Sequence, residues 1–90
     1  MIYQNPAFVR AAKRLPAETR TALNAKVALL ASSFGRPHLH RGLGIRPFGR
    51  YLEFRVELKT RALFLPLDGA LVLIYVGSHD QCRTYLRNNR

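Results

Sequence analysis

The sequence has 90 residues, a formal net charge of +10 and a hydrophobic share of 48%. This length predicts a single domain over residues 1–90, and the hydrophobic share is too high for a disordered chain. The longest apolar run, residues 70–76, is far shorter than the roughly 20 residues of a membrane-spanning helix, and the N-terminus does not resemble a signal peptide. One cysteine, Cys82, excludes an internal disulfide and supplies no metal cluster. We therefore expect a cytoplasmic protein with no membrane partner, no metal and no cofactor.

Arginine dominates the charge. Lys and Arg number 15 against 5 Asp and Glu, and 12 of the 15 are arginines. The guanidinium group binds phosphate through two parallel hydrogen bonds and keeps its charge at all relevant pH values. The composition therefore favours a polyanionic partner, either nucleic acid or the ribosome, over the alternative of a basic surface without a partner.

The first half of the chain has the signals of two helices. Asn5 and Pro6 are an N-cap followed by proline at the first helical position, and Pro16 can open a second helix. Apolar residues then recur at spacings of three and four, which is typical of a helix with one buried face. Gly35 and Pro37 end the pattern. We expect two antiparallel helices with apolar stripes formed by Phe8, Ala12 and Leu15 and by Leu23, Val27, Leu30 and Phe34.

The second half has the signals of strands. Residues 51–58 alternate between apolar and polar side chains, and residues 61–67 and 70–76 are two further extended runs joined by Asp68-Gly69, a hairpin turn signal. Pro66 lacks a backbone donor, so its strand should be an edge or bulge there, and a short strand over residues 45–48 could pair with residues 51–58. The fold class is therefore α+β, with the two helices on one face of a small, mainly antiparallel twisted sheet.

Polar and basic side chains gather around the alternating strand. Its polar side offers Glu53, Arg55 and Glu57, and the next strand begins with Arg61. Further cations and rings lie just before and after these strands, which predicts a concave basic surface on the open face of the sheet. These flanking residues are Arg46, Arg50, His79, Arg83 and Tyr85.

The order of these segments resembles a known family. Two helices followed by "YLEFR", "TRALF", "DG", "LVLIYVG" and "HDQCRTY" are similar to the RelE/ParE superfamily of bacterial type II toxin–antitoxin toxins, over essentially the whole chain. For the RelE-like branch this resemblance implies a ribosome-dependent mRNA interferase, an endoribonuclease that cleaves mRNA in the ribosomal A site. It also implies three partners: a cognate antitoxin that blocks the toxin, the ribosome and mRNA.

The resemblance implies roles for individual residues. Arg61 matches an arginine that contacts the scissile phosphate, and His79 resembles a general acid near the C-terminus. Arg55 and Glu53 occupy the positions of two strand lysines, Tyr85 that of a tyrosine that stacks on a base. Arg46 matches an arginine that contacts the RNA backbone. The expected catalytic set is His79, Arg61, Arg55, Glu53 and Tyr85, and the expected RNA-binding set is Arg46, Arg50, Lys59, Arg83, Arg41 and His40.

These residue types fit cleavage through the 2′-hydroxyl. That reaction needs a base for the hydroxyl proton, cations for the phosphorane and an acid for the leaving 5′-oxygen. Histidine suits the acid role and arginine the cation role, whereas a glutamate among arginines is a weak base. Structural alternatives stay open: Glu53 and Glu57 could only neutralise strand cations, His79 could be a solvated turn residue, and Tyr85 could cap the core.

Two other functions fit the composition. One is a ParE-like toxin that inhibits DNA gyrase and has no nuclease activity. The other is a basic RNA-binding or ribosome-binding module without toxicity. The combination of Arg61, His79 and Tyr85 favours the nuclease over the ParE-like toxin. The expected convergence of these three residues and Arg55 on one face favours it over the binding module.

Overall fold

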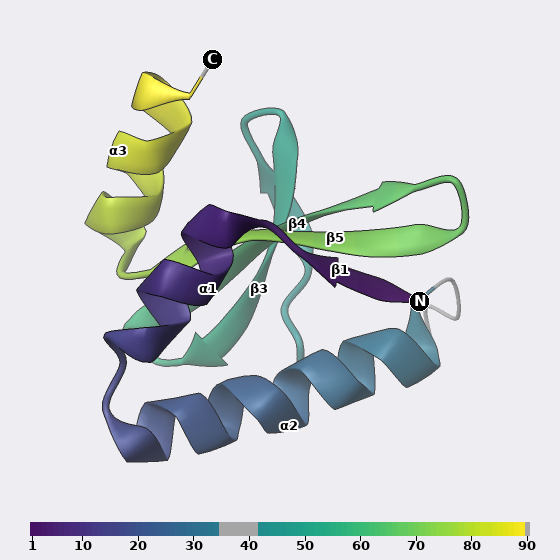
Figure 1. Ribbon diagram of the computed structural model, residues 1–90, viewed down its shortest axis with the longest axis horizontal. Coiled ribbons are helices and arrows are strands. Elements are labelled where there is room, and N and C mark those ends of the chain that lie inside the picture. Colours follow the sequence, from purple (N-terminus) through teal and green to yellow (C-terminus); the bar gives the residue numbers. More distant parts are fainter. Residues whose placement is uncertain (35–41, 90) are drawn as a thin grey trace.

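The computed structural model describes residues 1–34 and 42–89. The described residues form an α+β fold in which three helices pack around one five-stranded sheet (Figure 1). Within the described residues, no helix is long and apolar enough to cross a membrane. The elements in chain order are β1 (Ile2–Gln4), α1 (Pro6–Lys13), α2 (Ala17–Ser33), β2 (Arg46–Phe48), β3 (Tyr51–Glu57), β4 (Thr60–Leu67), β5 (Ala70–Gly77) and α3 (His79–Asn88).

The two N-terminal helices begin where the sequence predicts. The Asn5 side chain accepts a hydrogen bond of 2.7 Å from the Ala7 amide, and Pro16 is the N-cap of α2. Both helices cover one face of the sheet, and Figure 1 shows that they diverge from the corner between them. As a result α1 packs mainly on β5 and α2 on β3. The core on this face includes Phe8, Leu23, Leu30, Phe54, Phe64 and Leu73.

The sheet has the order β1-β5-β4-β3-β2, and every pairing except that of β1 with β5 is antiparallel. The strand β1 was not predicted, because three residues are too few to show alternation. The β4–β5 turn has positive φ at Asp68 (48°) and Gly69 (78°), as a two-residue hairpin requires. Pro66 pairs only with β5, beyond the point where β3 begins, so the expectation of a local edge is confirmed.

The helix α3 was not predicted. No element was predicted after residue 76, yet Ser78 caps a ten-residue helix. The Ser78 side chain accepts a hydrogen bond from the Gln81 backbone amide (3.1 Å), and the Gln81 side chain accepts one from the Ser78 backbone amide (2.8 Å). This capping box satisfies two backbone donors that would otherwise lack partners. The helix packs on the opposite face of the sheet from α1 and α2, where Cys82 contacts a second apolar cluster with Tyr51, Leu63 and Ile74.

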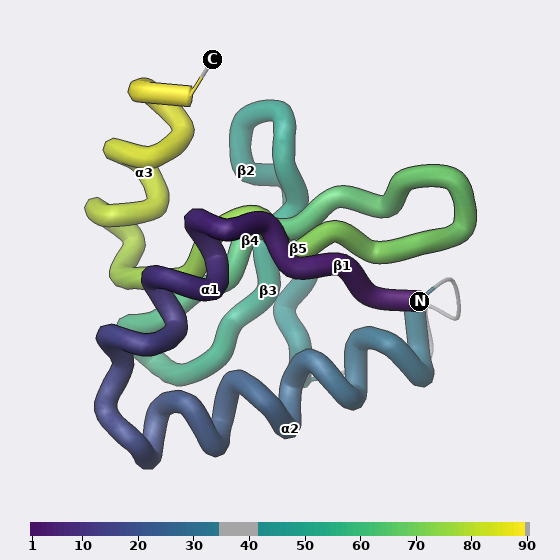
Figure 2. The backbone as a smooth tube through the Cα atoms, in the orientation of Figure 1, coloured from purple at the N-terminus to yellow at the C-terminus, as the bar shows by residue number. Residues whose placement is uncertain are grey.

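The α3 helix also contacts the turn between β2 and β3. Gly49 in that turn has a φ of +59°, and a Cβ atom there would lie 2.5 Å from Cδ2 of Leu86. The positive φ favours glycine, and a side chain at this position would displace Leu86. The turn and α3 therefore stand side by side, as the chain trace shows (Figure 2).

Candidate functional site

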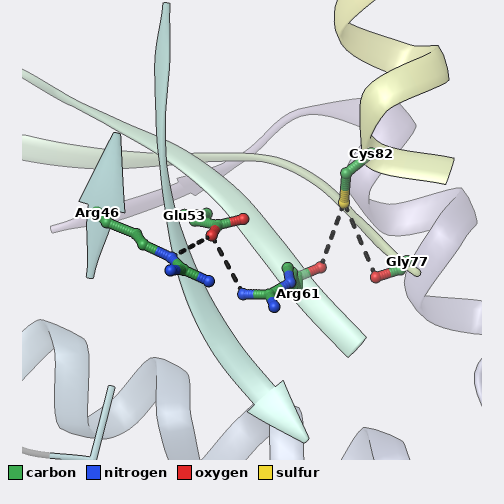
Figure 3. A network of polar contacts seen from close by, with 5 residues as sticks. All are labelled: Arg46, Glu53, Arg61, Gly77 and Cys82. Atoms are coloured by element: carbon green, nitrogen blue, oxygen red, sulfur yellow. Dashed lines mark hydrogen bonds and ion pairs between the residues drawn. The ribbon is translucent and has the colours of Figure 1, made fainter. Parts of the chain in front are cut away.

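A buried glutamate binds two arginines on the α3 side of the sheet. Oε1 of Glu53 accepts hydrogen bonds from Nε of Arg46 (2.9 Å) and from Nη1 of Arg61 (3.2 Å) (Figure 3). Strand pairing brings the three together, because Arg46 lies opposite Glu53 on β2 and Arg61 lies on β4. The Glu53 side chain is 3% exposed, that of Arg61 15% and that of Arg46 56%. The network thus extends from the interior to the surface.

The burial of Glu53 corrects the expectation that it lies on an open face. Glu53 lies opposite Leu63 of β4 and near Cys82 of α3, and both of these residues are completely buried. The other carboxylate oxygen, Oε2, has no hydrogen-bond partner among the described residues. A carboxylate that is enclosed and bonded to two guanidinium groups is poorly placed to take a proton from a substrate. Its geometry suits orienting Arg46 and Arg61.

Arg61 and His79 line one open hollow of about 290 Å³ at the start of α3. Lys59 is there too, together with Leu58, Ser78 and Asp80. His79 is exposed, and its ring meets Phe48 edge to face at a centroid distance of 5.7 Å. The structure therefore brings together three residues that the sequence singled out: Arg61, His79 and Lys59. Phe48 was missed, because a single aromatic at the end of a three-residue strand carries no pattern.

Arg55 and Glu57 lie differently although both were expected on the polar side of β3. Arg55 is exposed and lies directly opposite Arg61 in the β3–β4 pairing. The pairing then shifts between Arg55 and Glu57. Past this bulge, Oε2 of Glu57 accepts a hydrogen bond of 3.2 Å from Thr19 of α2. Glu57 therefore contacts the face of the sheet that α2 covers. The alternation of side chains along β3 ends at this point, because a bulge adds an unpaired residue.

Tyr85 does not line the hollow that Arg61 and His79 share. Its ring stacks on Tyr75, with centroids 4.6 Å apart and an interplanar angle of 13°, and lies 6.3 Å from Tyr51. Tyr85 is six residues after His79, which is not a whole number of helical turns, so the two side chains lie on different sides of α3. A stacking role toward a base stays a prediction for Tyr85.

Two further predicted residues, Arg50 and Arg83, lie apart from the first hollow. They line a second hollow with Leu86 and Arg87. The Arg50 guanidinium lies 5.0 Å from the centroid of the Tyr51 ring and donates a hydrogen bond of 3.1 Å to its hydroxyl. Arg41 and His40, also predicted, lie outside the described residues.

Cys82 lies beneath the arginine network without the properties of a nucleophile. Burial, followed by the nearby Glu53 carboxylate, raises the pKa of the Cys82 thiol to about 12. Its sulfur is 3.6 Å from the Arg61 carbonyl oxygen and 3.8 Å from that of Gly77, so the single S–H donor is shared between two weak acceptor contacts. Among the described residues no cluster of His, Cys, Asp or Glu could hold a metal ion.

Comparison with known proteins places the fold. No protein-family model matches the sequence, and no curated protein matches it. Among solved structures, the chain resembles one in the RelB–RelE antitoxin–toxin complex of Methanococcus jannaschii, with a TM-score of 0.68, 14% identity, and coverage of 92% of this chain and 96% of that one. It also resembles YafQ of Escherichia coli strain BL21(DE3), with a TM-score of 0.70, 18% identity, and coverage of 91% and 96%.

A third similar structure is the DinJ–YafQ complex of Escherichia coli, with a TM-score of 0.63, 18% identity, and coverage of 90% of this chain and 94% of that one. Each of these matches covers nearly the whole length of this chain and of the matched chain. The resemblance to RelE-like toxins inferred from the sequence is confirmed at the level of the fold.

Proposed function

We propose that this protein is the toxin of a type II toxin–antitoxin pair and acts as a ribosome-dependent mRNA interferase. The RelE-like fold supports the proposal, since it is shared with toxins found in complexes with antitoxins. The net charge of +10 supports an RNA partner. The observation that carries the proposal is the arginine pair on Glu53, one member of which shares a hollow with His79.

The arginine pair is suited to binding the phosphate that reacts. Glu53 takes one N–H from each guanidinium, Nε of Arg46 and Nη1 of Arg61, so other donors of both groups remain for phosphate oxygens. Fixing the guanidinium groups before substrate arrives lowers the reorganisation needed in the transition state. Lys59 and the exposed Arg55 add positive charge beside Arg61. These cations stabilise the phosphorane as negative charge accumulates on it.

Cleavage then proceeds without an added reactant. The 2′-oxygen forms a bond to phosphorus, the bond from phosphorus to the 5′-oxygen breaks, and the products are a 2′,3′-cyclic phosphate and a free 5′-hydroxyl. His79 gives a proton to the leaving 5′-oxygen, and its edge-to-face contact with Phe48 orients the ring. Asp80 follows His79 in the chain and is the one carboxylate among the described residues that line this hollow.

The base that accepts the 2′-hydroxyl proton is not Glu53 in this proposal, because that carboxylate is buried and occupied by two arginines. We assign the proton acceptor and the alignment of the RNA strand to the ribosome. Without it the described site has its cations and its acid, but the buried Glu53 is not free to act as the base, so cleavage of free RNA is slow. Ribosome dependence follows from the incomplete set of catalytic groups.

The charge supports the antitoxin partner that the resemblance to antitoxin-bound toxins implies. Of the 12 Lys and Arg among the described residues, only Arg46 and Arg61 form an ion pair with an acidic group. An acidic segment that covers the arginine face would be attracted strongly and would block the hollow. Binding would also stabilise a domain of this small size.

The proposal is tested by translation of a defined mRNA in a reconstituted bacterial system, with new RNA ends mapped by primer extension. We expect cuts at A-site codons that require ribosomes and that disappear in Arg61→Ala. The matched control is Arg20→Ala, since Arg20 is an exposed arginine of α2 on the other side of the sheet. It should cut like the wild type. Intact mRNA with the toxin in excess over ribosomes would refute the interferase, and a DNA supercoiling assay would then test gyrase inhibition.

A further inference from the structure

Three arginines surround a hollow that lies apart from the hollow with Arg61 and His79. Arg50, Arg83 and Arg87 line it together with Leu86, and its volume is about 390 Å³. Arg50 comes from the turn after β2, whereas Arg83 and Arg87 come from α3. None of the five acidic residues, all of which lie in the described parts of the chain, lines this hollow. Its positive charge is therefore uncompensated.

The hollow is built by fixed elements. Leu86 packs closely against Gly49, since a Cβ atom there would lie 2.5 Å from Cδ2 of Leu86, and this contact places the turn against α3. Arg50 is oriented by the Tyr51 ring and by its hydrogen bond to the Tyr51 hydroxyl. An arginine whose conformation is already restricted loses less entropy when an anion binds.

The two arginines of α3 that line this hollow, Arg83 and Arg87, repel each other. Arg83 and Arg87 are four residues apart, so they lie on one face of the helix as a like-charged pair. Neither forms an ion pair with any acidic residue of the described chain. A bound anion would relieve this repulsion, and groups with several negative oxygens accept the guanidinium fork best.

The position of the hollow indicates which anion it takes. His79, Arg83 and Arg87 follow one another at four-residue intervals, about 6 Å apart along the helix axis. An extended RNA strand whose scissile phosphate lies at Arg61 and His79 could therefore continue along this face of α3. We propose that Arg50, Arg83 and Arg87 form a second phosphate subsite, which binds the backbone of the nucleotides flanking the cleavage point. This inference rests on the proposed function.

The test measures binding without cleavage. A fluorescein-labelled 2′-O-methyl RNA of twelve nucleotides has no free 2′-hydroxyl, so fluorescence anisotropy reports affinity alone. In Arg83→Ala/Arg87→Ala we expect affinity to fall about 10-fold, and the slope of log K against log salt to shrink by about 1.4, because two phosphate contacts are lost. Lys13→Ala/Arg20→Ala removes the same charge from exposed sites on and near α1 and α2, and should stay within about 2-fold of the wild type.

A third variant separates the effect of guanidinium geometry from the effect of positive charge. Arg83→Lys/Arg87→Lys should keep most of the salt slope while losing part of the affinity, since lysine cannot bind phosphate through two parallel hydrogen bonds. All three variants change exposed side chains, and their thermal unfolding should match that of the wild type. Equal RNA affinities for the Arg83/Arg87 double alanine variant and the Lys13/Arg20 control would overturn the subsite, whatever the translation assay gives.

The outcomes also separate this inference from the proposed function. If translation shows no cleavage while RNA binding depends on Arg83 and Arg87, the subsite stands as an RNA contact and the interferase proposal fails. A deca-glutamate peptide is the comparison probe. If its affinity falls in the double alanine variant and that of the RNA does not, the hollow binds an acidic protein segment and the RNA subsite is refuted.

Discussion

The face of the sheet under α1 and α2 is closed mainly by apolar side chains, whereas the face beside α3 encloses a carboxylate between two arginines. Phe54 and Phe64 are completely buried on the first face. On the second, Glu53 is just as enclosed, and its Oε2 has no hydrogen-bond partner in the described chain. Apolar burial stabilises a fold directly, while a buried ion pair roughly cancels its own desolvation cost. The first face therefore provides most of the stability, and the second holds two arginines in the positions that the proposed chemistry needs.

The largest effect that this comparison predicts is on the helix-covered face. Phe64→Ala should lower the free energy of unfolding by about 3–5 kcal/mol, because the ring is fully buried and packs on both Phe34 and Phe54. Leu65, its neighbour on the other face, is only partly buried, so Leu65→Ala should cost less, about 1–2 kcal/mol. Urea unfolding followed by circular dichroism measures both, and equal losses would contradict the difference between the faces.

A smaller effect separates the two glutamates of β3. Glu53→Gln leaves two guanidinium groups without their carboxylate, and it should lower the free energy of unfolding by about 1–3 kcal/mol while slowing RNA cleavage. Glu57→Gln is the matched control. Glu57 is exposed and keeps a single hydrogen bond to Thr19, so we expect a change below about 0.5 kcal/mol and normal cleavage. Similar results for the two variants would show that Glu53 does not organise the arginines.

The smallest effect concerns Cys82. Its pKa is raised to about 12 from an unfolded value near 9, so the native state keeps its proton while the unfolded state loses it. Stability should therefore be unaffected by this group below pH 9 and should fall as the pH rises from about 9 toward 12. Native protein at pH 8 should also resist iodoacetamide and react in urea. Rapid labelling of the native thiol would show that α3 does not cover it.

Much of the fold was predictable because its signals are local. The Asn5-Pro6 cap, the apolar stripes of α1 and α2, and the Asp68-Gly69 turn all act within a few residues. The edge position of Pro66 followed from its missing donor. The start of α3 was also marked locally, since Ser78 followed three residues later by Gln81 is a capping box pattern. That signal was overlooked because the segment is polar and short.

The site was predictable in its residues more than in its geometry. Arg61 and His79 do share a hollow, and Arg46 joins Arg61 through Glu53. Alternation alone placed Glu53 and Glu57 together on an open face, because it reveals neither a helix packing from the far end of the chain nor a bulge. The separation of Tyr85 from His79 likewise depends on the helix after β5, an element that was not predicted.

The central claim is that chemistry takes place beside α3, with His79 as the acid. The most direct measurement is single-turnover cleavage of mRNA on programmed ribosomes by His79→Ala, compared with the wild type and with Arg20→Ala. The imidazole is exposed, so its loss should leave thermal unfolding unchanged. We expect the cleavage rate to fall by about 10²–10⁴-fold, the usual contribution of general acid catalysis, while Arg20→Ala cuts normally. A rate for His79→Ala within about 3-fold of the wild type would place the acid elsewhere and contradict the account.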